Sequence, residues 1–297
     1  MSEHRCGMVA VIGRPNVGKS TLINAVMGRK VSIVTAKPQT TRHRILAVHS
    51  DDTAQIIFVD TPGLHRKAGK AMNRLMNRTA ANALADADVI LFVTDATHWT
   101  TEDDDVLKRL KQAHAPVVAV LNKIDKVHPR EKLLDALGLM AARHDFAEII
   151  PISAHKHDNL DQLMSMLPKF LPESPPLFPE DMHTDRSKEF HAAEVIREKL
   201  TLMLHQELPY GLTVQVERYV ADDKGVTINA VIWVERDSQK GIVVGKNGSL
   251  LKKVGTSARV ELKDLLQCNV HLELWVKVKT NWADNEKDLM NLGYEAP

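Results

Sequence analysis

The chain has 297 residues, of which 26% are charged and 44% are hydrophobic, so it carries enough apolar material for about two globular cores. The formal net charge of +1 excludes a uniformly basic coat, although a local basic patch remains open. Two cysteines exclude a disulfide scaffold, and no apolar run approaches the roughly 18 residues of a membrane span. We therefore expect a cytoplasmic protein.

The first part of the chain alternates short apolar runs with helical stretches. Buried strands rich in Val and Ile are predicted at residues 8–12, 55–59, 89–93, 117–121 and 148–152. Helices are predicted at residues 20–28, 72–84, 103–114, 130–144 and 159–167. This alternation is typical of a mostly parallel sheet with helices on both faces. We predict an α/β domain over residues 1–170.

Five prolines then fall between residues 168 and 179. Proline blocks helix interiors and sheet ladders, so residues 171–186 are predicted to form an extended, semi-stiff linker.

The pattern after the linker is different. It predicts an amphipathic helix at 188–208, strands at 213–220 and 226–235, a Gly-rich segment at 241–248, a helix at 250–266 and a strand at 270–278. We predict a separate α+β domain over residues 187–280. The acidic tail, 281–297, is expected to be a short helix or partly mobile.

A phosphate-binding motif follows the first predicted strand and opens the first predicted helix. The pattern G-x-x-x-x-G-K-[ST] and the next residue comprise Gly13, Arg14, Pro15, Asn16, Val17, Gly18, Lys19, Ser20 and Thr21. The glycines let backbone N–H groups face phosphates, and the helix N-terminus adds positive potential. We expect Lys19 to reach the β- and γ-phosphates and the Ser20 hydroxyl to bind Mg²⁺.

The strand at 55–59 ends in a second motif, Asp60-Thr61-Pro62-Gly63. A carboxylate at this strand end can hold Mg²⁺ through water, and the Gly63 N–H can sense a γ-phosphate because glycine tolerates the backbone change. Together with the phosphate loop upstream, the motif indicates a nucleotide site rather than a simple turn.

The polar loop at 38–42 is long enough to fold over a γ-phosphate. One of its threonines could give a hydroxyl to Mg²⁺ and leave when the phosphate leaves; we favour Thr41 over Thr40. The predicted metal ligands are Ser20, Thr41 and Asp60. An ordinary surface loop is the alternative interpretation.

The strand at 117–121 leads into Asn122-Lys123-Ile124-Asp125. The Asp125 carboxylate can accept hydrogen bonds from guanine N1–H and the 2-amino group, a donor pair that adenine lacks. Asn122 can brace the loop, and the Lys123 stem can lie on the ring. After the last strand, the Ala154 N–H of Ser153-Ala154 could donate to guanine O6.

The second domain carries a G-x-x-G loop before a helix. The predicted RNA-binding residues are Gly241, Gly245, Lys246, Asn247, Gly248, Lys252 and Lys253. Such a loop lets a sugar–phosphate backbone approach closely and clamps about four nucleotides. Residues 240–280 hold eight basic and three acidic residues, a modest phosphate-facing patch in a nearly neutral chain. A solvated helix face is the alternative.

These motifs resemble translation-factor-like P-loop GTPases, and the spellings G-R-P-N-V-G-K-S, Q-T-T-R and D-T-P-G-L resemble the Era/TrmE/Der group. One G domain, a Pro-rich linker and a single KH domain, with strands before its glycine loop (type II order), resemble the Era family. The resemblance implies a Mg²⁺-dependent GTPase that binds GTP and GDP. It further implies binding of small-subunit (16S) rRNA near its 3′ end and assistance to assembly of the 30S subunit.

The resemblance implies further properties. In related members an Asn at the place of Asn16 binds a monovalent cation, so K⁺ is an expected cofactor.

Leu64, which we assign to the switch, stands where Ras-type enzymes carry the Gln that orients the attacking water. We therefore assign no catalytic base. Slow intrinsic turnover, a monomer and peripheral contact with the inner membrane are also expected, although no long basic amphipathic helix indicates that contact.

Two other functions stay open on the residues alone. The KH-like domain could bind a protein or a membrane instead of RNA. Alternatively, the chain could be an RNA chaperone in which the nucleotide only stabilises the fold.

Overall fold

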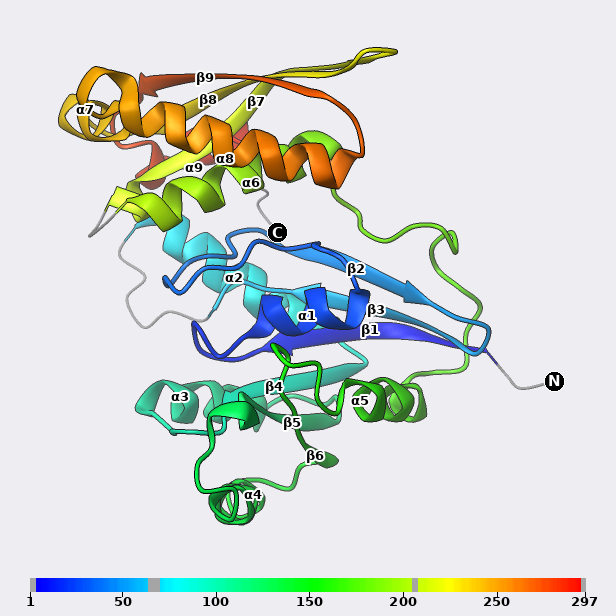
Figure 1. Ribbon diagram of the computed structural model, residues 1–297. Helices are drawn as coiled ribbons and strands as arrows, with labels where there is room; N and C mark the ends of the chain where they lie inside the picture. The colour runs from blue at the N-terminus through cyan, green and yellow to red at the C-terminus, as the bar shows by residue number, and fades with distance from the viewer. Residues whose placement is uncertain (1–3, 64–69, 205–207, 295–297) are drawn as a thin grey trace. The chain divides into compact units, whose positions relative to one another are not determined.

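The computed structural model describes residues 4–63, 70–204 and 208–294, which form two compact units (Figure 1). The first comprises residues 4–63 and 73–185, and the second comprises residues 70–72 and 186–294. Within these described ranges, no helix combines the length and the apolar character that crossing a bilayer requires.

The first unit has a six-stranded sheet in the order β2-β3-β1-β4-β5-β6, in which only the β2–β3 pair is antiparallel. Its elements are β1 (Arg5–Ile12), α1 (Lys19–Met27), β2 (Ile45–Ser50), β3 (Ala54–Asp60), α2 (Ala71–Ala85), β4 (Val89–Asp95), α3 (Thr101–Leu110), β5 (Val117–Asn122), η1 (Ile124–Lys126), α4 (Lys132–Ala141), β6 (Glu148–Pro151), α5 (Leu160–Met166) and η2 (Leu167–Phe170). The predicted mostly parallel sheet is confirmed.

Alternating residues of these strands face opposite layers of helix, as buried parallel strands require. Side chains of α3 and α4 pack on Ile12, Phe92 and Leu121 on one face, while α1 and α5 contact each other on the other face (Figure 1). The sheet order reverses direction between β1 and β4, and ligands of such sheets bind at the carboxyl ends of strands beside that point. The phosphate loop follows β1 there.

The strand β2 was not predicted. Its apolar run is only Ile45–Val48, flanked by Arg44 and His49, so the sequence pattern is short. The structure forms it because Asp51 closes a tight turn, accepting from the N–H groups of Thr53 (2.7 Å) and Ala54 (2.9 Å). The turn returns the chain antiparallel to β3.

The linker is extended, as predicted, but it is docked on the first unit rather than free. Cys6 N–H donates to Pro172 O (3.1 Å), and Val48 N–H donates to His183 O (3.0 Å). The linker thus follows the sheet and covers part of the edge of β2, which would otherwise expose unpaired backbone groups.

One buried side chain, Gln55, holds the middle of the linker. Its Oε1 accepts from the N–H groups of Leu177 (2.8 Å) and Phe178 (2.9 Å), and its Nε2 donates to Phe178 O (2.8 Å). Gln55 is fully buried, so these bonds satisfy polar groups that water cannot reach.

The second unit has a three-stranded sheet in the order β7-β8-β9, antiparallel between β7 and β8 and parallel between β8 and β9. Its elements are α6 (Lys188–Met203), η3 (Leu208–Gly211), β7 (Leu212–Asp222), β8 (Gly225–Val234), α7 (Asp237–Val244), η4 (Lys246–Gly248), α8 (Ser249–Leu266), β9 (Val270–Val278), η5 (Trp282–Asp284) and α9 (Glu286–Asn291). The predicted α+β KH domain of type II order is confirmed.

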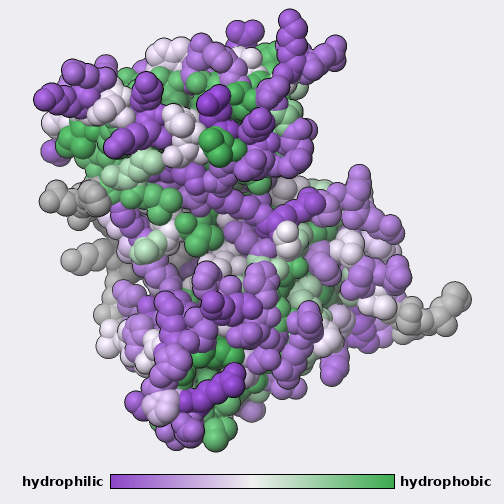
Figure 2. All heavy atoms as spheres, viewed as in Figure 1, coloured by the Kyte–Doolittle hydropathy of each residue, from purple (hydrophilic) through white to green (hydrophobic). Residues whose placement is uncertain are grey.

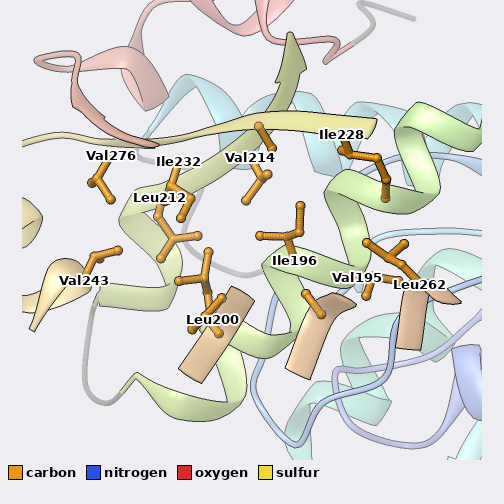
Figure 3. Packing of buried hydrophobic residues seen from close by; sticks show 14 of the residues in the cluster. Val195, Ile196, Leu200, Leu212, Val214, Ile228, Ile232, Val243, Leu262 and Val276 are labelled. Carbon is orange, nitrogen blue, oxygen red and sulfur yellow. The ribbon is translucent and has the colours of Figure 1, made fainter. Parts of the chain in front are cut away.

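The core of this unit lies between the sheet and its helices. Figure 3 shows Ile196 and Leu200 of α6 beneath the strand residues Leu212 and Ile232, and Leu262 of α8 beside Val195 in the same cluster. These six side chains are at most 2% exposed, and such burial contributes about 1.5–3 kcal/mol for each large aliphatic side chain.

Two expectations for this unit were wrong. Residues 237–244 form helix α7, so Gly241 lies inside a helix rather than in the glycine loop. Gln239 Oε1 caps α7 by accepting from the N–H of Glu235 (2.8 Å), and a Cβ at Gly241 would meet no atom, so the glycine does not break the helix. For the tail, the short-helix alternative is confirmed by α9 and the mobile alternative is wrong for residues 281–294: Trp282 is fully buried and Tyr294 is 2% exposed.

The docked linker gives a prediction for Gln55→Met. Methionine keeps the length of the side chain but cannot accept from Leu177 and Phe178, and a buried N–H left without a partner costs about 1–3 kcal/mol. We expect proteolytic cleavage within residues 172–185 of the folded protein to accelerate at least fivefold. Gln162→Met, on the exposed face of α5, is the matched control. Equal cleavage rates in the two variants would contradict the clamp.

Candidate functional site

The phosphate loop curls tightly between β1 and α1, and two glycines make that curl sterically feasible. A Cβ at Gly13 would lie 2.3 Å from Val93 O, and one at Gly18 would lie 2.3 Å from Asn122 Nδ2. Gly18 also has φ +102°, a conformation that other residues rarely adopt. The loop therefore sits against β4 and Asn122 with no room for side chains.

Lys19 points back into this loop. Its Nζ donates to the carbonyl oxygens of Gly13 (2.9 Å) and Arg14 (2.9 Å), and the side chain is almost fully buried. Burial lowers the pKa of Lys19 to about 8; Arg14 also lowers it, and Asp60 and Asp103 oppose the shift. A phosphate group would supply the negative charge that a buried ammonium needs.

The three predicted metal ligands come together. Ser20 Oγ donates to Asp60 Oδ2 (2.8 Å) and lies 2.9 Å from Thr41 Oγ1, which lies 3.3 Å from the same carboxylate oxygen. Burial raises the pKa of Asp60, whereas the Ser20 hydroxyl, the Lys19 ammonium and the Thr41 hydroxyl lower it.

These oxygens fit a divalent cation. Asp60 is fully buried, and its Oδ1 has no hydrogen-bond partner in the part of the chain that the structure describes. A hard cation such as Mg²⁺ prefers hydroxyl, carboxylate and water oxygens, and its charge would offset the cost of burying the carboxylate. The cluster would hold Mg²⁺ beside the β- and γ-phosphates.

The other switch residues lie in different places. Thr40 Oγ1 donates to Lys37 O (2.7 Å) within its own loop, so Thr41, and not Thr40, reaches the cluster of Ser20 and Asp60. Thr61 Oγ1 donates to Val11 O (3.1 Å). Leu64 lies outside the described residues.

The segment after β3 closes against the phosphate loop. A Cβ at Gly63 would lie 3.2 Å from Pro15 Cγ. Pro62 beside it is buried, and Val17 and Thr21 of the phosphate loop are buried and half-buried. A cavity of about 50 Å³ separates the phosphate loop from residues 33–41, so the switch loop lies directly over the phosphate loop.

A single amide, that of Asn122, joins the phosphate loop to the base-recognition loops. Its Nδ2 donates to Val17 O (2.8 Å), and its Oδ1 accepts from the N–H groups of Lys123 (2.8 Å) and Ala154 (3.0 Å). The Ala154 N–H, predicted to meet guanine O6, is thus already engaged by Asn122.

The carboxylate of Asp125, which is predicted to bind the base, is oriented by a hydroxyl. Ser153 Oγ donates to Asp125 Oδ1 (2.6 Å), which fixes the carboxylate and leaves its second oxygen for a ligand. The structure therefore brings Asp125, Ser153 and Ala154 to one place at the carboxyl ends of β5 and β6.

Two functional contacts were missed at the sequence level. Lys123 Nζ donates to Asp95 Oδ2 (2.7 Å) and Asn16 O (2.7 Å), so Asp95 positions the lysine. Arg14 of the phosphate loop donates to the buried Asp103 at the start of α3 (2.9 Å). The available signal was that Asp95, like Asp60, ends a fully buried strand.

The glycine loop of the second unit opens helix α8. Gly245 has φ +74°, and a Cβ there would lie 2.8 Å from Leu250 Cβ, whereas Asn247 and Gly248 adopt left-handed conformations. Lys246 and Asn247 at the tip are exposed, as are Lys252 and Lys253 on the first turns of α8. Backbone N–H groups, a helix N-terminus and cations therefore meet at one surface, which suits a phosphate backbone.

Comparisons with known proteins agree with both units. Residues 8–123 match the family model described as "50S ribosome-binding GTPase", and residues 207–283 match "KH domain". GTPase Era of Yersinia pestis (strain Pestoides F) is 47% identical over 97% of this chain and 96% of its own.

Two solved structures cover almost the whole chain. Era in complex with MgGDPNP and nucleotides 1506–1542 of 16S ribosomal RNA aligns with a TM-score of 0.94 and 41% identity over 98% of this chain and 99% of its own. A variant of Aquifex aeolicus Era bound to GDP and AlF₄⁻ aligns with a TM-score of 0.93 and 41% identity over the same shares, 98% and 99%.

The fold and the site together define a P-loop GTPase whose G domain is followed by a KH domain. The similarity extends over both domains at 47% identity. The chain belongs to the Era family of GTP-hydrolysing enzymes.

Base selection by Asp125 can be tested with Asp125→Asn. The amide cannot accept from both guanine donors, so we expect GTP affinity to fall by about 2–4 kcal/mol, roughly 30- to 1,000-fold, and xanthosine triphosphate to bind better than GTP. The measurement is a nucleotide titration by calorimetry. Asp161→Asn, an exposed position at the start of α5, should leave both affinities unchanged. A loss of GTP affinity below about threefold would contradict the role of Asp125.

Proposed function

We propose that this protein is a GTP-operated switch that binds small-subunit rRNA near its 3′ end through its KH domain and assists assembly of the 30S subunit. The single observation that carries the proposal is the exposed, cationic G-x-x-G loop at the start of α8 on the same chain as a P-loop GTPase domain. The complex of a 41% identical Era with nucleotides 1506–1542 of 16S rRNA supports the choice of RNA.

The KH surface is suited to a single strand. Lys246 and Asn247 project between two glycines, so a sugar–phosphate backbone can approach the loop without steric conflict. The exposed Lys252 and Lys253 extend the positive potential along α8. Gly241, four residues before Gly245 in α7, leaves an open surface that would let bases lie close to that helix.

For the nucleotide site, we propose that the predicted residues of the phosphate loop and of the two base-recognition loops bind GTP. Mg²⁺ would be held by Ser20, Thr41 and, through water, Asp60. Bound Mg²⁺ compensates the charge that develops on the phosphates during hydrolysis. Loss of the γ-phosphate would remove the contacts that hold Thr41 at the metal, and the loop at 38–42 would then be released.

Asn16 is proposed as a ligand of a monovalent cation, K⁺. Its amide Nδ2 donates to Ala36 O of the switch loop (2.8 Å), which brings a neutral amide and a carbonyl together at the edge of the phosphate site. Neutral oxygens of this kind suit a large monovalent cation. Binding would require the Asn16 amide to turn its oxygen toward the ion.

The remaining proposals rest on the resemblance and on composition. They are a monomer, a cytoplasmic location with a fraction in peripheral contact with the inner membrane, and a functional division into residues 1–170, 171–186, 187–280 and 281–297. The bonds of Pro172 and His183 to the first unit favour treating the linker as an extension of the G domain.

The RNA proposal predicts that Lys246→Asp with Asn247→Asp will weaken binding of a single-stranded oligomer of the 16S rRNA 3′ end at least tenfold. Two carboxylates would stand where phosphates approach, while both glycines of the turn remain. The measurement is filter binding at low and moderate salt, with GTP binding as the check on folding.

The matched control changes the same residue types at the other end of α8: Lys263→Asp with Asn269→Asp, both exposed. This pair alters the net charge equally, so it should weaken RNA binding much less. Equal losses in the two double variants, or no loss in either, would exclude the G-x-x-G loop and favour a KH domain that binds a protein or a membrane.

The cation proposal predicts faster GTP hydrolysis in K⁺ than in Na⁺ at equal ionic strength, and loss of that difference in Asn16→Ala. Single-turnover hydrolysis with saturating nucleotide separates this effect from binding. Identical wild-type rates in the two salts at every concentration would remove K⁺ from the mechanism.

A further inference from the structure

A cavity of about 480 Å³ lies in the first unit, apart from the phosphate-loop cavity. It is open to solvent on one side and is bordered by the segment after β4, the segment after β5 and helix α4. The two cavities share no lining residue. Its volume falls within the range of about 300–1,000 Å³ that is typical of small-molecule sites.

The inner part of this α4 cavity is apolar and aromatic. Leu121, Val127 and Met140 are buried residues of its lining, and Trp99 forms part of the wall. The Arg143 guanidinium lies 3.9 Å from the centre of the Trp99 ring, which holds the cation against the wall. Figure 2 shows apolar spheres at the foot of the view, where α4 lies. Leu139 of α4, which is 62% exposed, also lines the cavity.

The mouth of the cavity is cationic. Lys126 and Lys132 are exposed lining residues, whereas Arg143 is paired with Asp104 (3.7 Å); the lining carboxylates are Asp95 and Asp135. The Asp95 carboxylate already accepts a bond from Lys123 (2.7 Å), so its charge is largely compensated. An anionic group of a ligand would therefore be attracted electrostatically to the lysines at this mouth.

The lining residues also bond directly to the nucleotide site. His98 Nε2 lies 3.0 Å from a guanidinium nitrogen of Arg14, whose carbonyl oxygen accepts from Lys19 (2.9 Å). Asp95 holds Lys123 on the base-recognition side. A ligand that moved His98 or Asp95 would disturb groups that contact the phosphates and the base.

We propose that the α4 cavity is an effector site for a small organic anion with an apolar, preferably aromatic, body. The body packs on Trp99 and Met140, the anionic group lies at Lys126 and Lys132, and occupancy weakens the contacts of His98 and Asp95 with the nucleotide site. By linkage, a ligand that loosens bound GDP is itself bound less tightly when GDP is present.

The test uses 8-anilino-1-naphthalenesulfonate as the probe on the full chain saturated with GDP and Mg²⁺. We expect one saturable site by fluorescence. Ala136→Trp, which fills the cavity, and Lys132→Glu, which reverses charge at its mouth, should each weaken the probe at least fivefold. Lys108→Glu, the same charge change on an exposed face of α3, should not. Equal probe affinity in wild type and Lys132→Glu would overturn the site, even if Ala136→Trp failed to fold.

The coupling is read from the release of radiolabelled GDP. Saturating probe should accelerate release at least threefold in wild type and in Lys108→Glu, and have no effect in Ala136→Trp. In Lys132→Glu the same acceleration should require at least fivefold more probe. Unchanged release in wild type at probe saturation would overturn the effector role. Because GDP binding itself is measured in each variant, this outcome is distinct from a failure of the nucleotide site.

Discussion

The bonds of the Asn122 amide are the contacts on which the nucleotide site depends. One side chain at the end of β5 binds the phosphate loop through Val17 and the two base-recognition loops through Lys123 and Ala154. The contact is so close that position 18 must be glycine, since any Cβ there would lie 2.3 Å from the amide nitrogen. Three loops that are far apart in sequence are thereby set in one geometry before any nucleotide arrives, which is the physical basis of pre-organised binding.

Features written locally in the sequence could be predicted, and features that depend on distant partners could not. The phosphate loop could be predicted because its glycines and its lysine lie within seven residues, and Asp60 because it follows the apolar run at residues 56–59. By contrast, nothing near Asp95 in sequence reveals that it holds Lys123, 28 residues away. The strand β2 was missed because its apolar run is short, and the helix α7 because it contains an exposed glycine, Gly241; both give weak periodic signals. In the structure, the Asp51 turn returns the chain along β3 to form β2, and the Gln239 side chain caps α7.

The linker has a physical role beyond spacing. It ends on β2, where Val48 N–H binds His183 O (3.0 Å) and Leu46 N–H binds Asp185 Oδ1 (2.9 Å). The strand β2 begins four residues after Thr41, which lies at the proposed metal cluster. The switch loop is thus connected by a short stretch of chain to the strand that holds the end of the linker, immediately before the KH domain begins in sequence. Nucleotide binding and RNA binding would be coupled if the switch loop, β2 and the end of the linker had two alternative conformations, each favoured by one nucleotide state.

The central claim, that nucleotide state governs RNA binding, is tested most directly by the affinity of the full chain for a single-stranded 16S rRNA 3′-end oligomer. Filter binding would compare the protein without nucleotide, with GDP and Mg²⁺, and with a non-hydrolysable GTP analogue and Mg²⁺. The account predicts the tightest binding with the GTP analogue, by at least fivefold over GDP, and an equal reciprocal gain in analogue affinity when RNA is bound. Equal RNA affinity in all three states would contradict the switch and leave the two domains as independent binding modules.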